Sequence, residues 1–227
     1  MEPFFPALLD ELITSAFGEH VRRKFHFDEE HTVEIQKVAE EMLPALRKEA
    51  FWVRAAYPME HSDQAGNADT AYEKVAMSLG NGVDLLQERY SEKGFLLQSY
   101  IVEALAGELL MRGYDSYNRH IAEHTAKHVA QYHFPGSEER FPLETIPKLL
   151  ESLTQKITCN AAFCMQPKKS VVFVSELTQD ETVRCQGICV GCNNTTCPNR
   201  IKENQIIRKR MTDLPLTYGY SRIFGER

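Results

Sequence analysis

The longest regular pattern in the chain is a set of apolar residues at helical spacing, which extends from Phe95 to about Val129. It predicts one long helix with a single buried face, so the other segments have to supply the surfaces that cover that face. Ala104, Ala106 and Gly107 lie between the larger side chains and would allow a neighbouring element to pack closely. The large apolar positions of the predicted face are Leu96, Leu97, Ile101, Leu105, Leu109 and Leu110.

Shorter patterns predict the elements around this helix. Further helices are expected over residues 6–24, 30–50, 83–90 and 142–153, and strands over 51–57, 75–79, 157–165 and 170–177. A turn at Pro167-Lys168-Lys169 would join the last two strands as a hairpin. Because helices dominate the first two-thirds and strands gather near the middle and the end, the order favours an α+β fold over alternating βαβ units.

Composition and charge exclude several classes of protein. With 43% hydrophobic and 26% charged residues, the 227-residue chain has the balance of a soluble globular protein. The formal net charge of −6 argues against broad nucleic-acid binding, which depends on neutralising phosphates. No apolar run is long enough to span a membrane, and the N-terminus lacks the features of a secretory signal, so a cytoplasmic location is expected.

The cysteines indicate a metal site. Four of the six lie in one short stretch with the spacing C-x3-C-x2-C-x4-C, followed directly by Pro198. Thiolates are soft ligands, and four of them together suit zinc or an iron–sulfur cluster in a reducing compartment. The four predicted metal ligands are Cys185, Cys189, Cys192 and Cys197.

Spacing favours a [4Fe-4S] cluster, with zinc as the alternative. A structural zinc ribbon pairs two C-x2-C knuckles across a gap of about 15–20 residues, whereas here all four cysteines share one compact loop. Close-set cysteines that end in Cys-Pro resemble a bacterial ferredoxin-type loop. Gly187 and Gly191 between them leave room for the backbone to fold around a cluster.

A basic segment follows the cysteines. The segment fits docking of an acidic partner, such as a redox protein, because charge steers such encounters. A solvated helix end explains the same residues equally well. The basic residues are Lys202, Arg208, Lys209 and Arg210.

Three short segments match known motifs, in the same order along the chain. Residues 75–80 (VAMSLG) resemble a strand that ends in T-L-G, residues 135–144 (PGSEERFPLE) resemble P-G-Y-x-x-x-P-L-E, and residues 165–171 (MQPKKSV) resemble M-x-P-x-K-S-V. Together they resemble the reactivation domain of cobalamin-dependent methionine synthase and its stand-alone relatives. The small-residue helix from Leu97 to Leu110 is also similar to the helix that follows the T-L-G strand in the family, and the cysteine-rich ending is similar to that of stand-alone members. The resemblance spans roughly residues 28–200.

The resemblance implies a fold and an activity. The family fold is a curved, mainly antiparallel sheet packed with helices, here followed by a C-terminal cysteine-rich loop. The chain would then consist of an N-terminal helix (1–27), an activation-domain-like core (28–180), and a cysteine-rich loop with a basic helix (181–227). The implied activity is reductive methylation of an oxidised corrinoid: the domain binds S-adenosylmethionine, while cobalamin comes only through a partner.

The donor site implied by the family departs from the family pattern. Tyr132 stands where the family has an arginine for the donor's carboxylate, Ser137 replaces a tyrosine, and Ala161 replaces a glutamate. The backbone turn at Pro135-Gly136 is retained. The residues expected to line a cofactor site are Tyr132, His133, Pro135, Gly136 and Ser137. The departures predict weak binding of S-adenosylmethionine, and the cysteine cluster becomes the main predicted site.

A row of histidines lies on the long predicted helix. His120, His124 and His128 recur every four residues, so they can share one helix face. Two histidines at this spacing can bind a metal, although a solvated histidine face has the same pattern.

Overall fold

The computed structural model describes residues 1–58, 70–183, 185 and 188. Five antiparallel strands form the main sheet in the order β1-β2-β3-β7-β4, and a separate pair, β5-β6, lies beside it. The strands are β1 (Glu2–Pro3), β2 (Phe51–Ala56), β3 (Ala71–Ser78), β4 (His128–His133), β5 (Thr158–Cys159), β6 (Met165–Gln166) and β7 (Ser170–Thr178). The α+β prediction with a mainly antiparallel sheet is therefore confirmed.

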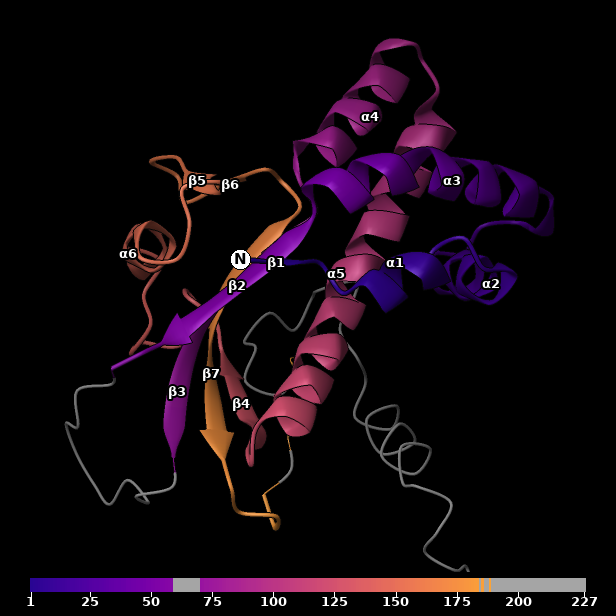
Figure 1. The fold of residues 1–227 in the computed structure, drawn as a ribbon. Helices are drawn as coiled ribbons and strands as arrows, with labels where there is room; N and C mark the ends of the chain where they lie inside the picture. The colour runs from indigo at the N-terminus through magenta and orange to yellow at the C-terminus, as the bar shows by residue number, and fades with distance from the viewer. Residues whose placement is uncertain (59–69, 184, 186–187, 189–227) are drawn as a thin grey trace, which may run out of the picture.

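Helices cover both faces of the sheet. In Figure 1, α1–α5 lie on one side of the strands, and α6 lies with β5 and β6 on the other. The helices are α1 (Pro6–Glu11), α2 (Ser15–Lys24), α3 (Thr32–Glu49), α4 (Asn81–Glu92), α5 (Leu96–His124) and α6 (Thr145–Glu151), and a 3₁₀ turn, η1 (Glu29–His31), precedes α3. In the part of the chain described, no helix combines the length and the apolar character needed to cross a bilayer.

The long predicted helix exists but ends earlier than its pattern indicated. Helix α5 stops at His124, and Thr125 takes an extended conformation. The Thr125 hydroxyl donates to the Ile121 carbonyl (2.7 Å) and accepts from the Lys127 amide (3.1 Å), so the chain reverses into β4. At the other end Leu96, predicted to be buried, is 70% exposed. Apolar residues of β4 continued the helical pattern by chance and extended the predicted helix.

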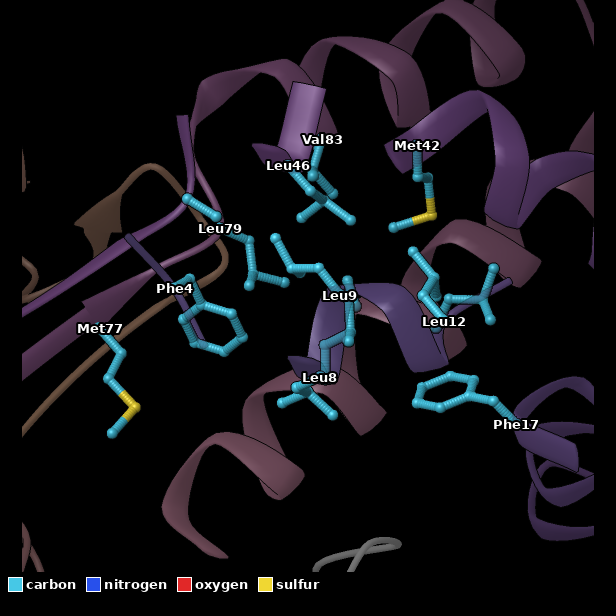
Figure 2. Close-up of a cluster of buried hydrophobic side chains, with 14 of the residues drawn as sticks. Phe4, Leu8, Leu9, Leu12, Phe17, Met42, Leu46, Met77, Leu79 and Val83 are labelled. Atoms are coloured by element: carbon cyan, nitrogen blue, oxygen red, sulfur yellow. The ribbon is translucent and has the colours of Figure 1, made fainter. Parts of the chain in front are cut away.

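The larger core joins the N-terminal segment to the helical layer. Figure 2 shows Phe4, Leu8, Leu9 and Leu12 packed among residues from α3, α4 and β3. The helix predicted over 6–24 is two helices, because Thr14 caps α2 by accepting a hydrogen bond from an amide of its first turn. Residues 1–27 therefore share one core with the rest of the helical layer.

Gly80 makes the sharp connection between β3 and α4. Its φ of +82° lies in the region that glycine adopts without strain, and a Cβ here would overlap the Cβ of Glu49 and lie 3.2 Å from its backbone carbon. The Glu49 carboxylate accepts a hydrogen bond from the Gly82 amide at 2.7 Å. Close contact and this hydrogen bond fix α3 against the start of α4.

The predicted hairpin of the last two strands is wrong. Strand β7 pairs with β3 and β4 in the middle of the main sheet, not with the segment before it. Residues 157–165 do not form one strand: they contain the two-residue strand β5 and the first residue of β6, Met165, which pair with each other. Strand β7 is largely buried on both faces of the sheet. Its apolar residues therefore favour a central position, with a neighbouring strand on each side, over a hairpin with one local neighbour.

Candidate functional site

The Pro135-Gly136 turn directly follows β4 and is closed by hydrogen bonds. The Gly136 amide donates to the Phe141 carbonyl at 2.6 Å, and the Ser137 amide and hydroxyl both donate to the Phe134 carbonyl, at 3.0 and 2.7 Å. Gly136 has a φ of +85°, and a Cβ there would lie 2.7 Å from a Leu143 methyl carbon. Only glycine fits this turn without strain. The Ser137 hydroxyl is used locally to close it.

His133 is the titratable residue that the turn positions. It is 1% exposed and lies on the sheet face covered by α6. Its Nδ1 is 2.9 Å from a Glu138 carboxylate oxygen, and its Nε2 is 3.4 Å from one of Glu176. Because a carboxylate only accepts, both contacts are hydrogen bonds only when each ring nitrogen carries a proton.

Charged and aromatic neighbours complete this site. The hydrogen bond from His133 lowers the pKa of the Glu176 carboxyl, against the opposing effect of burial. Tyr72 and Arg140 favour the same charged form of Glu176, while burial raises the pKa of the Tyr72 hydroxyl. The His133 ring stacks on Phe141 with centroids 5.3 Å apart. The result is a buried imidazole between two carboxylates at the edge of an aromatic layer.

Tyr132 faces the opposite side of the sheet. Its hydroxyl donates to the Tyr114 carbonyl on α5 at 3.1 Å, and burial raises its pKa well above the usual range. Adjacent residues of a strand point to opposite faces, so Tyr132 and His133 do not contribute to one pocket here. The structure thus places two of the predicted cofactor-site residues on different faces.

Cys185 lies on the same face as Tyr132. It is half-buried against the larger core, and its charge contributes to the raised pKa of Tyr132. The remaining predicted ligands, Cys189, Cys192 and Cys197, lie outside the described residues, as does the basic segment after them. Within the described residues, the cysteine-rich segment thus begins against the α5 side of the sheet.

Ala161, which the resemblance aligns with a glutamate, falls in the turn between β5 and β6. Asn160 closes this turn, since its side-chain oxygen accepts from the Ala162 and Cys164 amides, both at 2.9 Å. Cys159 is half-buried and Cys164 is exposed. Burial and the Cys164 charge raise the pKa of the Cys159 thiol. No carboxylate replaces the missing glutamate within residues 160–162.

The histidine row is divided between two elements. His120 and His124 lie on α5 with their rings stacked, centroids 4.2 Å apart and planes 17° apart. His128 is the first residue of β4, and its Nε2 bonds the Val183 carbonyl at 2.8 Å. Across the described parts of the chain, no three His, Cys, Asp or Glu side chains converge as a metal-binding group.

Sequence reasoning identified His133 but missed both carboxylates beside it. Glu176 had a recognisable signal, because it is the one charged residue in the otherwise apolar or hydroxyl-bearing strand β7. Glu138 had none, since it belongs to a run of charged residues in a turn.

Comparison with known proteins identifies no family for this chain. No protein-family model matches it, and no curated protein matches it significantly.

Proposed function

We propose that the chain is an accessory protein for corrinoid or methyl-transfer metabolism, with an activation-domain-like core that carries a metal centre on its cysteine-rich segment. The observation that carries the proposal is the set of four cysteines, Cys185, Cys189, Cys192 and Cys197, within one short segment. Thiols this dense are typical of metal sites. The antiparallel α+β core and the three family-like segments support the choice of scaffold.

The four thiolates would hold a [4Fe-4S] cluster, which supplies one-electron transfer when bound. Cys185 supports this role because it lies half-buried beside Tyr132. A cluster held by Cys185 would therefore lie against the sheet and α5. Burial tunes the potential of such a centre. Partners would be a redox protein or a corrinoid protein, and cobalamin would enter only with the latter.

A zinc-binding interaction module is the second candidate. The same four thiolates suit a closed tetrahedral zinc site, which would stiffen the C-terminal segment for contact with a partner. The side chains at the predicted donor site favour this non-catalytic alternative, since the hydroxyls of Ser137 and Tyr132 are both engaged in internal hydrogen bonds.

Anaerobic purification followed by iron, sulfide and zinc analysis separates the two candidates. A [4Fe-4S] protein contains iron and sulfide in equal amounts and is brown, whereas a zinc module is colourless. Replacing one ligand, Cys189→Ser, should remove most of the metal in either case. Cys164→Ser is the matched control, because Cys164 is exposed and belongs to the β5–β6 turn. Full metal retention in Cys189→Ser, or equal loss in Cys164→Ser, contradicts the proposed ligand set.

A further inference from the structure

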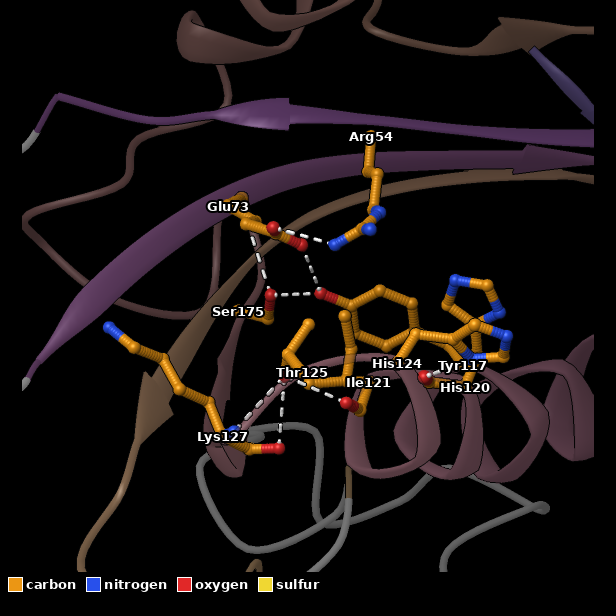
Figure 3. Close-up of polar contacts among 9 residues, drawn as sticks. All are labelled: Arg54, Glu73, Tyr117, His120, Ile121, His124, Thr125, Lys127 and Ser175. Carbon is orange, nitrogen blue, oxygen red and sulfur yellow. Dashed lines mark hydrogen bonds and ion pairs between the residues drawn. The ribbon is translucent and has the colours of Figure 1, made fainter.

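Tyr117 of α5 is a buried phenol that faces a carboxylate. Its side chain is fully buried, and its hydroxyl donates to a Glu73 carboxylate oxygen on β3 at 3.1 Å. Figure 3 shows this contact within a small polar cluster between α5 and the sheet. The phenol of Tyr117 therefore has a base in place that can receive its proton.

Hydrogen bonds on both sides of the contact fix its geometry. An ion pair with Arg54 of β2, at 2.8 Å, orients the Glu73 carboxylate. The Ser175 hydroxyl lies 2.6 Å from the phenolic oxygen of Tyr117. A phenol has one proton, which Glu73 accepts, so Ser175 is the donor in the second contact. The phenolic oxygen thus keeps a hydrogen bond when its own proton moves to Glu73.

Burial keeps this phenol neutral and makes a charge on its ring costly. Burial raises the pKa of Tyr117 above its usual range, the Ser175 hydrogen bond opposes that shift, and the Glu73 charge adds to it. Removing an electron from the ring would leave a positive charge in the core, which is expensive unless it is compensated. Transfer of the phenolic proton to Glu73 removes that charge from the ring, so loss of the electron and loss of the proton are favoured together.

Trp52 is the redox-active ring in contact with Tyr117. The two rings meet edge to face with centroids 5.9 Å apart. On its other side, Tyr117 contacts Phe173 at 5.7 Å, and Phe173 contacts Tyr132 at 5.5 Å. Indole and phenol are among the side chains that lose a single electron most readily. Trp52 and Tyr117 therefore place two such groups side by side in one buried aromatic layer.

We propose that Trp52 and Tyr117 form a proton-coupled electron-transfer pair, with Glu73 as the proton acceptor. A small inorganic radical oxidant, such as the carbonate radical, takes one electron from Trp52 and is reduced to carbonate. Tyr117 then passes one electron to the Trp52 radical cation while its O–H bond breaks and the proton joins Glu73. The products are a neutral indole, a phenoxyl radical and a carboxylic acid. The pair does not depend on what the four cysteines bind.

The single tryptophan allows the transfer to be started at one place. Light that indole absorbs and phenol does not photoionises Trp52 selectively in the full-length protein, because the chain has no other tryptophan. Transient absorption should then show the tryptophan radical decaying while a tyrosyl radical appears at the same rate. The wild type and the variants have the same cysteines, so absorption by any bound metal cancels in the comparison.

Two variants test the electron donor and the proton acceptor separately. Tyr117→Phe should abolish the tyrosyl signal and prolong the life of the tryptophan radical. Glu73→Gln should slow the transfer about a hundredfold or more, the usual contribution of a positioned proton acceptor. The glutamine oxygen still accepts a hydrogen bond from the phenol, so slower transfer in this variant reports the proton and not the packing.

Tyr114→Phe is the matched control. Tyr114 lies about one turn before Tyr117 on α5, and its ring contacts Phe173 of the same aromatic layer at 5.2 Å. This variant should form the tyrosyl radical at the wild-type rate. A tyrosyl signal that persists in Tyr117→Phe, a wild-type rate in Glu73→Gln, or a wild-type protein that forms no tyrosyl radical would overturn the proposal.

Discussion

At the scale of single residues, Gly80 carries the most stringent requirement in the described structure. A Cβ at this position would be disfavoured twice, by the positive φ of the backbone and by overlap with Glu49. Relieving either one would require the backbone of Gly80 or of Glu49 to move. Gly107 provides the contrast. It lies within α5 and a Cβ there would meet nothing within 4 Å.

Gly80→Ala should therefore lower the free energy of unfolding by about 2–4 kcal/mol, the sum of left-handed strain and overpacking. Gly107→Ala should raise it by about 0.5–1 kcal/mol, because alanine is the better helix former. Urea denaturation followed by circular dichroism measures both. Equal stability of Gly80→Ala and the wild type would show that α3 can move away from the β3–α4 connection.

The residue scale also shows how far the sequence could predict the site at the turn. His133 and the Pro135-Gly136 turn were found because a glycine after a proline is a local signal. The contact between His133 and Glu176 was not predicted, because Glu176 reaches His133 only once β7 pairs with β4. Likewise, no sequence pattern indicated that Tyr132 bonds Tyr114 on α5.

At the scale of elements, Glu108 links two helices that are far apart in the sequence. It is 4% exposed on α5, and it faces Lys24 and His20 of α2 and Arg112 of its own helix, at 2.7–2.9 Å. Burial by itself would raise the pKa of the Glu108 carboxyl, but the hydrogen bonds from His20, Lys24 and Arg112 outweigh burial and lower the pKa to about 2.

The depressed pKa makes stability depend on pH. A carboxyl with a lower pKa in the folded state stabilises the fold above its unfolded value, 4.5, and this contribution is lost as the pH falls toward about 2. Glu108→Gln should lower the free energy of unfolding by about 1–3 kcal/mol at neutral pH. The difference between the two proteins should shrink between pH 4.5 and 2, as measured by urea denaturation at each pH. A difference that is constant over this range would assign the stability to packing instead of charge.

Elements with a clear periodic spacing of apolar residues were predicted well, and elements whose pairing depends on residues distant in sequence were not. Strand β2 and helices α3 and α4 follow local patterns, and each lies within a few residues of its predicted bounds. Only the first two residues of strand β4 were included in the predicted long helix and the rest of the strand was not predicted, and β7 was assigned to the wrong neighbour. In both cases the sheet pairing that decides the structure joins residues far apart in sequence, so no local pattern records it.

At the scale of the whole molecule, the side chains beside the Pro135-Gly136 turn make contacts within the protein. Tyr132 and Ser137, which the resemblance aligns with an arginine and a tyrosine, both make internal hydrogen bonds. Ala161, which the resemblance aligns with a glutamate, lies in the β5–β6 turn. The chain therefore lacks both charged side chains that the resemblance assigns to the donor.

Binding of S-adenosylmethionine should accordingly be weak or undetectable. Losing a charged hydrogen-bond partner costs about 1.5–3 kcal/mol, so losing two would weaken binding by about two to four decades if the effects add. Isothermal titration calorimetry measures the affinity. Low-micromolar binding would show that other groups, such as His133 or Arg140, have replaced the lost contacts. That result would support the reactivation mechanism that the resemblance implies.

The central position of β7 also has a consequence for synthesis on the ribosome. Ser170 at the start of β7 bonds Ser78 at the end of β3, and the two are separated by 92 residues. At the usual rate of translation, the nascent chain therefore waits roughly 5–20 s between making β3 and making its neighbour. During that interval β3, and later also β4 once it is made, lack the strand between them, and their open edges can pair with other chains. A nascent polypeptide of this kind is a natural client for ribosome-associated chaperones.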